Sequence, residues 1–265
     1  MSLSIAIAGA AGRMGQALIR TAAADSRFRI VGGTERADAN ALGADIGVLA
    51  GVEALGVKIS DDPRAASSGA DVWIDFTSPA ATLAALAQTQ ARAAIVGATG
   101  FSPEQHAPIA AAAQRLAIVR SGNFSLGVTV LTVLVRQAAQ KLGVDWDIEI
   151  TEAHHRRKLD APSGTALLLG EGAAHGRGRS LRELRLSARD GAIGERPAGG
   201  IGFSVIRGGG IVGAHGVAFL AEREMITLSH QAFDRALFAD GALAAALWVA
   251  DKPPGLYSMN DVLDL

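Results

Sequence analysis

The chain has 265 residues, of which 49% are hydrophobic and 19% charged, so it can bury one large core or two modest ones. Its formal net charge of −1 provides no overall field for nucleic acid or an anionic membrane, and it contains no cysteine for a disulfide framework or a thiolate metal site. No apolar run approaches the ~20 residues that span a bilayer, and no basic signal segment precedes the first apolar run. We therefore expect a soluble cytoplasmic protein with no nucleic-acid, membrane or metal partner.

The N-terminal residues predict a strand–helix–strand unit. An apolar run, Leu3–Ala8, ends in a glycine-rich turn, Gly9–Gly15, and a helix-like segment follows over Gln16–Ala24. A second strand-like run covers Phe28–Gly33. This order is that of a βαβ unit with glycines at its first turn.

The glycine-rich turn is a candidate dinucleotide site. Its spacing is G-x-x-G-x-x-G, with Ala11 where the commonest fingerprint has its second glycine. Small residues let the backbone approach a pyrophosphate, and the N-terminus of the next helix stabilises the phosphate charge. The residues expected to contact the cofactor here are Gly9, Ala10, Ala11, Gly12, Arg13 and Met14. The alternative is a tight turn that only packs the helix on the sheet.

An acidic residue at the end of the second strand supports the nucleotide interpretation. Glu35 lies 20 residues after Gly15 and can accept hydrogen bonds from the adenosine ribose hydroxyls. Arg36 beside it can instead pair with a 2′-phosphate. The expected cofactors are therefore NADH, NADPH or both.

Residues 37–119 continue the alternation of strands and helices. The segment 37–56 is rich in glycine and alanine and predicts a loop or a short helix. The strands expected after it are 71–76, 93–96 and 116–119, and the helices are 79–90 and 102–115. The alternation predicts an α/β fold with a Rossmann-like, doubly wound parallel sheet.

Two turns in this region are candidates for the nicotinamide half of the cofactor. In doubly wound sheets ligands lie beyond the carboxyl ends of the strands, and both turns directly follow predicted strands. The candidate residues are Gly97, Ala98 and Thr99 in one turn, and Ser121, Gly122, Asn123 and Phe124 in the other. Either turn could also be a plain loop.

A long helix, Leu126–Leu142, is expected to join two domains, and a strand is expected over Asp145–His155. The strand leads into two adjacent histidines and three consecutive cations. His154 and Lys158 are four residues apart, which places them on one side of the chain. An imidazole beside an ammonium suits an anionic substrate that must gain a proton. We expect His154 to donate that proton, and Lys158 to stabilise charge and share in donation.

The next residues predict a helix N-terminus that can bind an anion. Ser163 can cap a helix that starts at Gly164, and Pro162 precedes it. The free N–H groups of the first helical turn would attract an anion. With the cations before it, the turn suggests a dicarboxylate or phosphorylated ligand, held by His155, Lys158, Gly164 and Thr165. The alternative is a solvated charge run followed by an ordinary capped helix.

The remaining residues predict a second, α+β domain with a mixed or antiparallel sheet. The strands expected are 184–189, 203–206, 211–220 and 222–229, with loops over 175–182 and 190–200. A final helix covers 233–249, and an irregular tail covers 252–265. Few helices remain to cover both faces of this sheet, so one face is expected to meet another subunit.

The segment from Glu152 to Ala166, EAHHRRKLDAPSGTA, resembles the signature of the 4-hydroxy-tetrahydrodipicolinate (dihydrodipicolinate) reductase family. Gly9–Gly15 also resembles the nucleotide loop of this family, and the turns after residues 96 and 120 resemble its nicotinamide contacts. The family usually has threonine where this sequence has Ala98, so only a backbone role is expected at that position.

The resemblance implies an NAD(P)H-dependent reduction in the diaminopimelate route to lysine. It implies 4-hydroxy-tetrahydrodipicolinate as substrate, loss of water during the reaction, and a homotetramer formed through the second sheet. It also implies that the end of the chain returns to the nucleotide domain. The expected boundaries are 1–125 with 235–265 for dinucleotide binding, and 126–234 for substrate binding and oligomerisation.

Two other functions are compatible with parts of the sequence. A non-catalytic NAD(P)-binding sensor would keep the glycine turn but would not need the His154–Lys158 pair. Another two-domain dehydrogenase, acting on amino acids or sugars, would lack the 152–166 signature.

Overall fold

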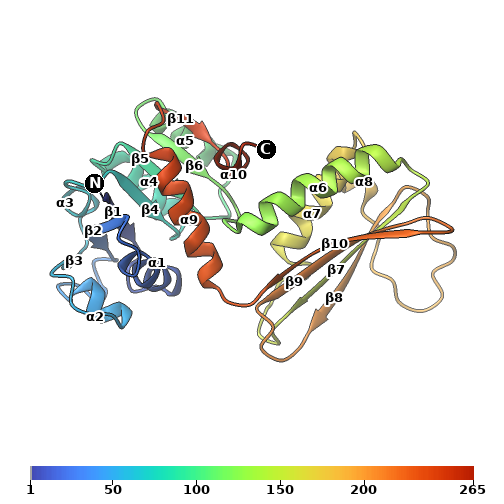
Figure 1. Cartoon of the computed structure of the whole chain (residues 1–265), viewed down its shortest axis with the longest axis horizontal. Helices are drawn as coiled ribbons and strands as arrows, with labels where there is room; N and C mark the ends of the chain where they lie inside the picture. The colour runs from blue at the N-terminus through green and yellow to red at the C-terminus, as the bar shows by residue number, and fades with distance from the viewer. Residues whose placement is uncertain (1) are drawn as a thin grey trace. The chain divides into compact units, whose positions relative to one another are not determined.

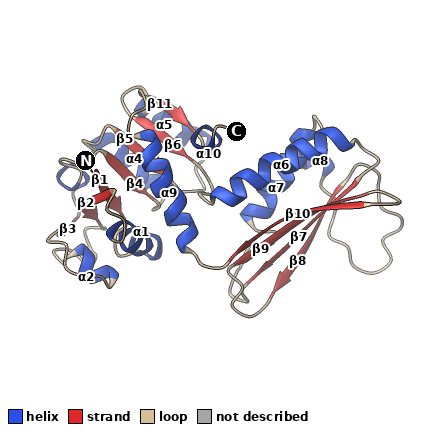
Figure 2. Ribbon diagram, in the orientation of Figure 1, coloured by secondary structure: helices blue, strands red, loops and turns tan. Residues whose placement is uncertain are grey.

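The computed structural model describes residues 2–265 and forms two compact units (Figure 1). The first contains residues 2–125 and Ala236–Leu265, and the second contains Leu126–Arg235. Each unit is built around its own sheet and has its own hydrophobic core (Figure 2).

The first unit is built on a seven-stranded parallel sheet with the order β11-β6-β5-β4-β1-β2-β3. Its strands are β1 (Leu3–Ala8), β2 (Phe28–Thr34), β3 (Ile59–Ser60), β4 (Val72–Asp75), β5 (Ala93–Val96), β6 (Ala117–Arg120) and β11 (Gly255–Tyr257). The chain builds outward from β1 to β3 and then returns to β4 on the other side of β1. The predicted Rossmann-like, doubly wound sheet is therefore confirmed, with its switch point between β1 and β4.

Helices cover both faces of this sheet. They are α1 (Arg13–Ala23), α2 (Ile46–Ala50), α3 (Pro63–Ala66), α4 (Pro79–Gln88), the 3₁₀ turn η1 (Pro103–Gln105), α5 (His106–Ala112), α9 (Ala236–Val249) and α10 (Met259–Leu263). Trp73, Ala94 and Ile118 form one core with residues of α3 and α4. Alternate strand residues such as Ile74 and Ile95 are also fully buried, and α9 contacts β4, β5 and β6.

The C-terminal residues are more regular than predicted. The tail 252–265 was expected to be irregular, but it contains β11, which pairs in parallel with β6, and α10. A strand of three residues is too short to show a periodic sequence pattern. It forms because it pairs with the edge of the sheet. Helix α10 did have a local signal, since Ser258 and Asp261 form a capping box.

The second unit is built on a four-stranded mixed sheet with the order β10-β9-β7-β8. Its strands are β7 (Asp147–His154), β8 (Ile201–Arg207), β9 (Gly213–Leu220) and β10 (Met225–Ala232), and its helices are α6 (Leu126–Leu142), α7 (Gly164–Gly176) and α8 (Leu181–Leu184). Helices α6 and α7 pack on each other and share a core with Ile148, Ile150, Val217 and Phe219. In Figure 2 both helices lie on the same side of the sheet.

One strand of this sheet runs opposite to the expected direction. The segment around 203–206 was expected to join an antiparallel set, but β8 pairs with β7 in parallel, whereas β9 is antiparallel to both β7 and β10. The chain passes through α7 and α8 between β7 and β8. A helical crossover of this kind returns the chain to the same end of the sheet and gives a parallel pair.

The strand predicted over Leu184–Arg189 was wrong. Residues 181–184 form α8, and only Arg185 makes a bridge, to Ile201. Alternating leucines and charged residues imitate a strand there. The capping box between Ser180 and Glu183 favours a helical turn instead.

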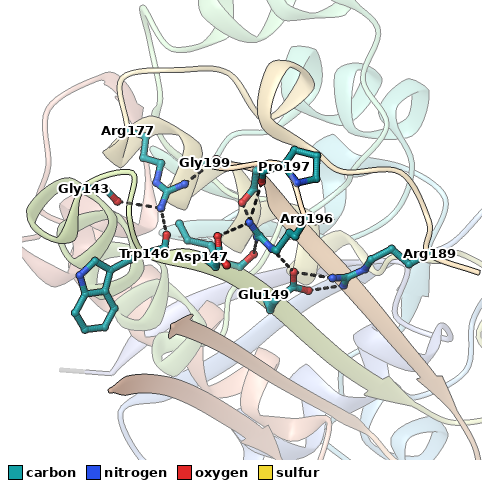
Figure 3. Close-up of polar contacts among 11 residues, drawn as sticks. Gly143, Trp146, Asp147, Glu149, Arg177, Arg189, Arg196, Pro197 and Gly199 are labelled. Carbon is teal, nitrogen blue, oxygen red and sulfur yellow. Dashed lines mark hydrogen bonds and ion pairs between the residues drawn. The ribbon is translucent and has the colours of Figure 1, made fainter. Parts of the chain in front are cut away.

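The following residues form the predicted long loop, and arginines attach this loop to β7 (Figure 3). Arg196 donates to Asp147 Oδ1 at 2.6 Å and to Glu149 Oε1 at 3.1 Å, and Arg189 also pairs with Glu149. Arg177, at the end of α7, donates to the carbonyl oxygen of Gly199 at 2.7 Å. Side chains rather than backbone pairing thus fix this loop.

Candidate functional site

The glycine-rich turn between β1 and α1 has the geometry of an anion cradle. Gly9 has φ +64°, and a Cβ on Gly15 would lie 2.1 Å from the carbonyl oxygen of Gly9. Helix α1 begins at Arg13, earlier than predicted, with Gly12 as an N-cap whose terminus no side chain caps. The turn thus presents backbone and an uncapped helix start, which fits a dinucleotide pyrophosphate.

Glu35 lies directly after β2, beside this turn. Its Oε1 accepts a hydrogen bond of 2.8 Å from the N–H of Ala11. Arg36 next to it is 80% exposed and lies 3.8 Å from Asp38. A pocket of about 480 Å³ in the first unit is lined by Gly9, Glu35, Arg36, Asp61 and Thr77 among others. The pocket and the turn together suit the adenosine half of a dinucleotide.

The two other candidate turns follow β5 and β6 and therefore lie at the same edge of the parallel sheet as the glycine turn. A Cβ on Gly97 would lie 2.1 Å from the Phe76 ring, and Ala98 is buried. Phe124 is also buried and packs edge-on against Phe76, with ring centroids 5.1 Å apart. Phe124 can therefore offer a ligand only its backbone. In the second turn, the hydroxyl of Ser121 donates to the carbonyl oxygen of Asn123 at 2.6 Å.

In the second unit, His154 is the last residue of β7 and is 8% exposed. The buried residues of this strand alternate as Ile148, Ile150, Glu152 and His154. The first two pack in the core under α6 and α7. The same face therefore changes from apolar to ionisable within one strand.

The Glu152 carboxylate is buried beside His154, with its side chain 1% exposed. Oε1 accepts from the N–H of Ser163 at 2.9 Å and from Arg207 Nη2 at 2.7 Å. Oε2 lies 2.7 Å from Arg207 Nη1 and 2.6 Å from His154 Nδ1. Burial raises the pKa of Glu152, but the hydrogen bonds from Arg207, His154 and Ser163 outweigh it and lower the pKa to about 2. Glu152 is therefore an ionised acceptor at neutral pH.

A second buried histidine, His215 of β9, completes this cluster. Its ring packs edge-on against His154, with centroids 5.1 Å apart, and its Nε2 lies 3.2 Å from Ser163 Oγ. Burial, together with the nearby His154, lowers the pKa of His215 to about 4. His215 is therefore neutral at pH 7 and suits a structural role beside His154.

The residues after β7 form the turn that contains the other predicted site residues. Lys158 Nζ pairs with Asp160 Oδ1 at 2.8 Å. The His155 ring lies 3.1 Å from Arg235 Nη2, and burial together with Arg157 and Arg235 lowers the pKa of His155. The ring is therefore neutral at pH 7, and because Arg235 can only donate, Nε2 accepts and Nδ1 carries the hydrogen.

Helix α7 starts where predicted. Ser163 is its N-cap and accepts a hydrogen bond of 3.2 Å from the N–H of Ala166. Gly164 and Thr165 form its first turn, and the space around a Cβ on Gly164 is open. The same Ser163 bonds to Glu152 and His215, so this helix start is attached to the cluster around His154.

Three members of this cluster, Glu152, Arg207 and His215, were not predicted from the sequence. One signal was available for Glu152, because a period of two counted back from His154 gives Glu152, Ile150 and Ile148. Arg207 and His215 had no such local signal. Pairing of β8 and β9 with β7 places them there, with His154 opposite Arg207 and Glu152 opposite His215.

Both parts of the chain match models of a known protein family. Residues 3–124 match the family model described as "Dihydrodipicolinate reductase, N-terminus", and residues 127–263 match "Dihydrodipicolinate reductase, C-terminus". The chain belongs to the dihydrodipicolinate reductase family. It is accordingly an oxidoreductase that uses a nicotinamide cofactor.

Similar proteins cover nearly the whole chain. A 4-hydroxy-tetrahydrodipicolinate reductase of Dinoroseobacter shibae is 55% identical over 263 residues and covers 98% of each chain. One of Rhizobium rhizogenes is 51% identical over 267 residues, covering 100% of this chain and 97% of the relative.

Solved structures support the fold. A dipicolinate-bound dihydrodipicolinate reductase from a Paenisporosarcina species has a TM-score of 0.76 at 23% identity and covers 97% of this chain and 98% of its own. An amine dehydrogenase of Mycobacterium smegmatis has a TM-score of 0.60 at 14% identity, covering 98% and 96%. Within residues 2–265 there is no helix long and apolar enough to cross a membrane and no cluster of three His, Asp or Glu side chains placed for a metal ion.

Proposed function

We propose that this chain reduces 4-hydroxy-tetrahydrodipicolinate to tetrahydrodipicolinate, with loss of water, in the diaminopimelate route to lysine. The observation that carries the proposal is the buried His154, held by Glu152 in a chain that matches reductases of this name over almost its full length. A non-catalytic sensor would not need a buried imidazole of this kind. Another two-domain dehydrogenase would not share this level of identity.

The first unit is proposed to bind NADH or NADPH, and a bound reduced nicotinamide supplies a hydride. The uncapped turn with Ala10, Ala11, Arg13 and Met14 would hold the pyrophosphate, because it offers backbone N–H groups and a helix N-terminus. Glu35 would accept from the ribose hydroxyls. The turns 97–99 and 121–124 would bind the nicotinamide side, with Gly122 and Ala98 acting through backbone alone.

The second unit is proposed to bind the substrate and supply the proton. His154 would donate from Nε2, since its Nδ1 faces Glu152. Lys158 would stabilise the negative charge that develops on the ring and share in donation. His155, Lys158, Gly164 and Thr165 would hold the two carboxylates, because they combine a helix N-terminus with cationic and neutral donors.

The same unit is proposed to form a homotetramer, and the enzyme to work in the cytoplasm. Helices α6 and α7 lie on one side of the second sheet, and on its other side β8 and β10 expose Ile206 and Met225. A surface of this kind is typical of a subunit interface. Sedimentation should give about four times the chain mass of 27.1 kDa.

A coupled assay tests the catalytic proposal. The product of dihydrodipicolinate synthase is supplied to the enzyme with NADH and, separately, with NADPH, and nucleotide oxidation is followed by absorbance. We expect rapid oxidation with at least one nucleotide and none with a panel of 2-oxo acids. Oxidation that depends on a 2-oxo acid instead would contradict the proposed substrate.

Arg36→Ala tests the choice of nucleotide. Only NADPH carries a 2′-phosphate, and a charge-assisted hydrogen bond to it contributes about 1.5–3 kcal/mol. We expect the KM for NADPH to rise about tenfold or more and the KM for NADH to change little. Arg27→Ala is a matched control, since Arg27 is exposed and pairs with Asp25. Equal losses with both nucleotides would show that Arg36 does not read the phosphate.

A further inference from the structure

Glu152 lies at the centre of the cluster around His154. Its carboxylate contacts three residues of the second unit: Arg207 of β8, Ser163 at the start of α7, and His154 at the end of β7 itself. All four hydrogen bonds are between 2.6 and 2.9 Å. A buried carboxylate stays ionised only when charged and polar partners satisfy it in this way.

We propose that Glu152 is a positioning residue that fixes the tautomer of His154, so that Nδ1 always carries a proton and only Nε2 exchanges one with the substrate. The inference rests on the proposed role of His154 as proton donor. An ionised carboxylate has no proton to donate, so the 2.6 Å contact requires an N–H at His154 Nδ1. Nε2 then donates its proton to the reacting ring, and a neutral imidazole with Nδ1–H remains on Glu152.

Arg207 makes this arrangement specific for a carboxylate. Its two terminal nitrogens donate to both oxygens of Glu152, and its Nη2 also donates to the carbonyl oxygen of Asp160 at 2.8 Å. Both partners of Oε1, Arg207 Nη2 and the Ser163 N–H, can only donate, whereas Oε2 faces one such donor, Arg207 Nη1, and His154 Nδ1. An amide at position 152 would therefore place its oxygen at the Oε1 position. The amide NH₂ would then face His154 Nδ1, which would have to become an acceptor.

The surroundings of Nε2 agree with this assignment. A Cβ on Gly213, at the start of β9, would lie 3.2 Å from His154 Nε2. Glycine at this position leaves that side of the ring free of a side chain. The charged and titratable groups that influence this site are Arg207, His215, His230, Lys158 and His155.

The first test measures the tautomer in the wild-type enzyme. Histidine labelled with ¹⁵N gives distinct nitrogen shifts for the two neutral tautomers, and comparison with His154→Gln identifies the His154 signals among the six histidines. We expect Nδ1–H with unprotonated Nε2 at high pH. Nε2–H in the wild-type enzyme would overturn the proposal, whatever the variants do, and this result does not depend on the substrate being the proposed one.

The second test uses Glu152→Gln, Glu152→Asp and the control Glu149→Gln, which lies on the opposite face of β7. We expect Glu152→Gln to show the reversed tautomer and to lose kcat by about 10²–10⁴-fold, with the KM for nucleotide unchanged. Glu152→Asp keeps an acceptor and should retain the tautomer and recover part of kcat. An unchanged tautomer in Glu152→Gln, or a kcat within about twofold of wild type, would contradict the proposal. Failure of the wild-type enzyme in the coupled assay would instead contradict the proposed function.

Discussion

The two faces of strand β7 each have a glutamate held by arginine, yet the two pairs differ in burial and in what they hold. On one face, Glu149 is 20% exposed and pairs with Arg189 and Arg196 of the long loop (Figure 3). On the other face, Glu152 is 1% exposed and pairs with Arg207 of the neighbouring strand. The first pair attaches a loop to the sheet, whereas the second pair has an imidazole as its third partner.

The difference shows what makes a carboxylate–arginine pair functional. Partly exposed pairs contribute little beyond holding their segments together, because water competes for the charges. A buried pair cannot lose one partner without leaving an unpaired charge in the protein interior. The face of β7 that contains Glu152, the inner face, therefore holds its imidazole in one orientation. The face that contains Glu149, the outer face, can tolerate substitutions.

The largest expected effect comes from removing the imidazole of the inner face. His154→Gln should lower kcat by about 10²–10⁴-fold, because it removes the proposed proton donor, with little change in nucleotide binding. Steady-state kinetics and nucleotide titration measure the two effects separately. His175→Gln, at an exposed position near the end of α7, is the matched control. If His154→Gln keeps kcat within about a factor of two, His154 is not the donor.

The next prediction uses the pH dependence of stability to test whether His215, on the inner face, is buried in its neutral form. The unfolded chain protonates His215 near its ordinary pKa of 6.5, but the folded chain does so only near 4. The unfolded state therefore binds more protons between these values, and stability falls as the pH drops through this window. The contribution lost is about 3 kcal/mol.

Chemical unfolding of wild type and His215→Asn at about pH 8 and about pH 4 measures this contribution. The difference in unfolding free energy between the two proteins should shrink by about 3 kcal/mol at the lower pH. His175→Asn should show no such pH-dependent difference. A gap between wild type and His215→Asn that is the same at both pH values would show that His215 is not buried in its neutral form.

A smaller effect is expected on the outer face. Arg196→Met removes hydrogen bonds to Asp147, Glu149 and the carbonyl oxygens of Ile148 and Gly200. Loss of these contacts should destabilise the protein by about 1–3 kcal/mol and leave kcat nearly unchanged, since the loop is attached away from His154. Denaturant midpoints and the coupled assay measure the two properties. A large fall in kcat with unchanged stability would reverse the roles assigned to the two faces.

The smallest effect is expected for Arg189→Ala. Its side chain is 34% exposed and pairs with Glu149, so solvent screening limits the loss to about 0.2–1 kcal/mol. The same denaturation series, run at low and high salt, should show that the loss disappears as salt is added. A loss larger than that of Arg196→Met would contradict the ranking.

Local patterns in the sequence determined several parts of this protein. Apolar runs that end in glycine turns predicted the parallel sheet and the position of the glycine-rich turn, because strand burial and turn geometry depend on neighbouring residues. The Ser163 cap predicted the start of α7, since a cap acts within one helical turn. His154 and Lys158 could be proposed as site residues from the sequence because they belong to one continuous motif.

Tertiary structure decided the rest. Arg207 and His215 are 55 and 63 positions from Glu152 in the sequence, and only strand pairing brings them to the carboxylate. The direction of β8 depends on a helical crossover, and β11 exists only because β6 offers an unpaired edge. Contacts between distant segments depend on register and topology. Those properties belong to the whole sheet, so no single stretch of sequence determines them.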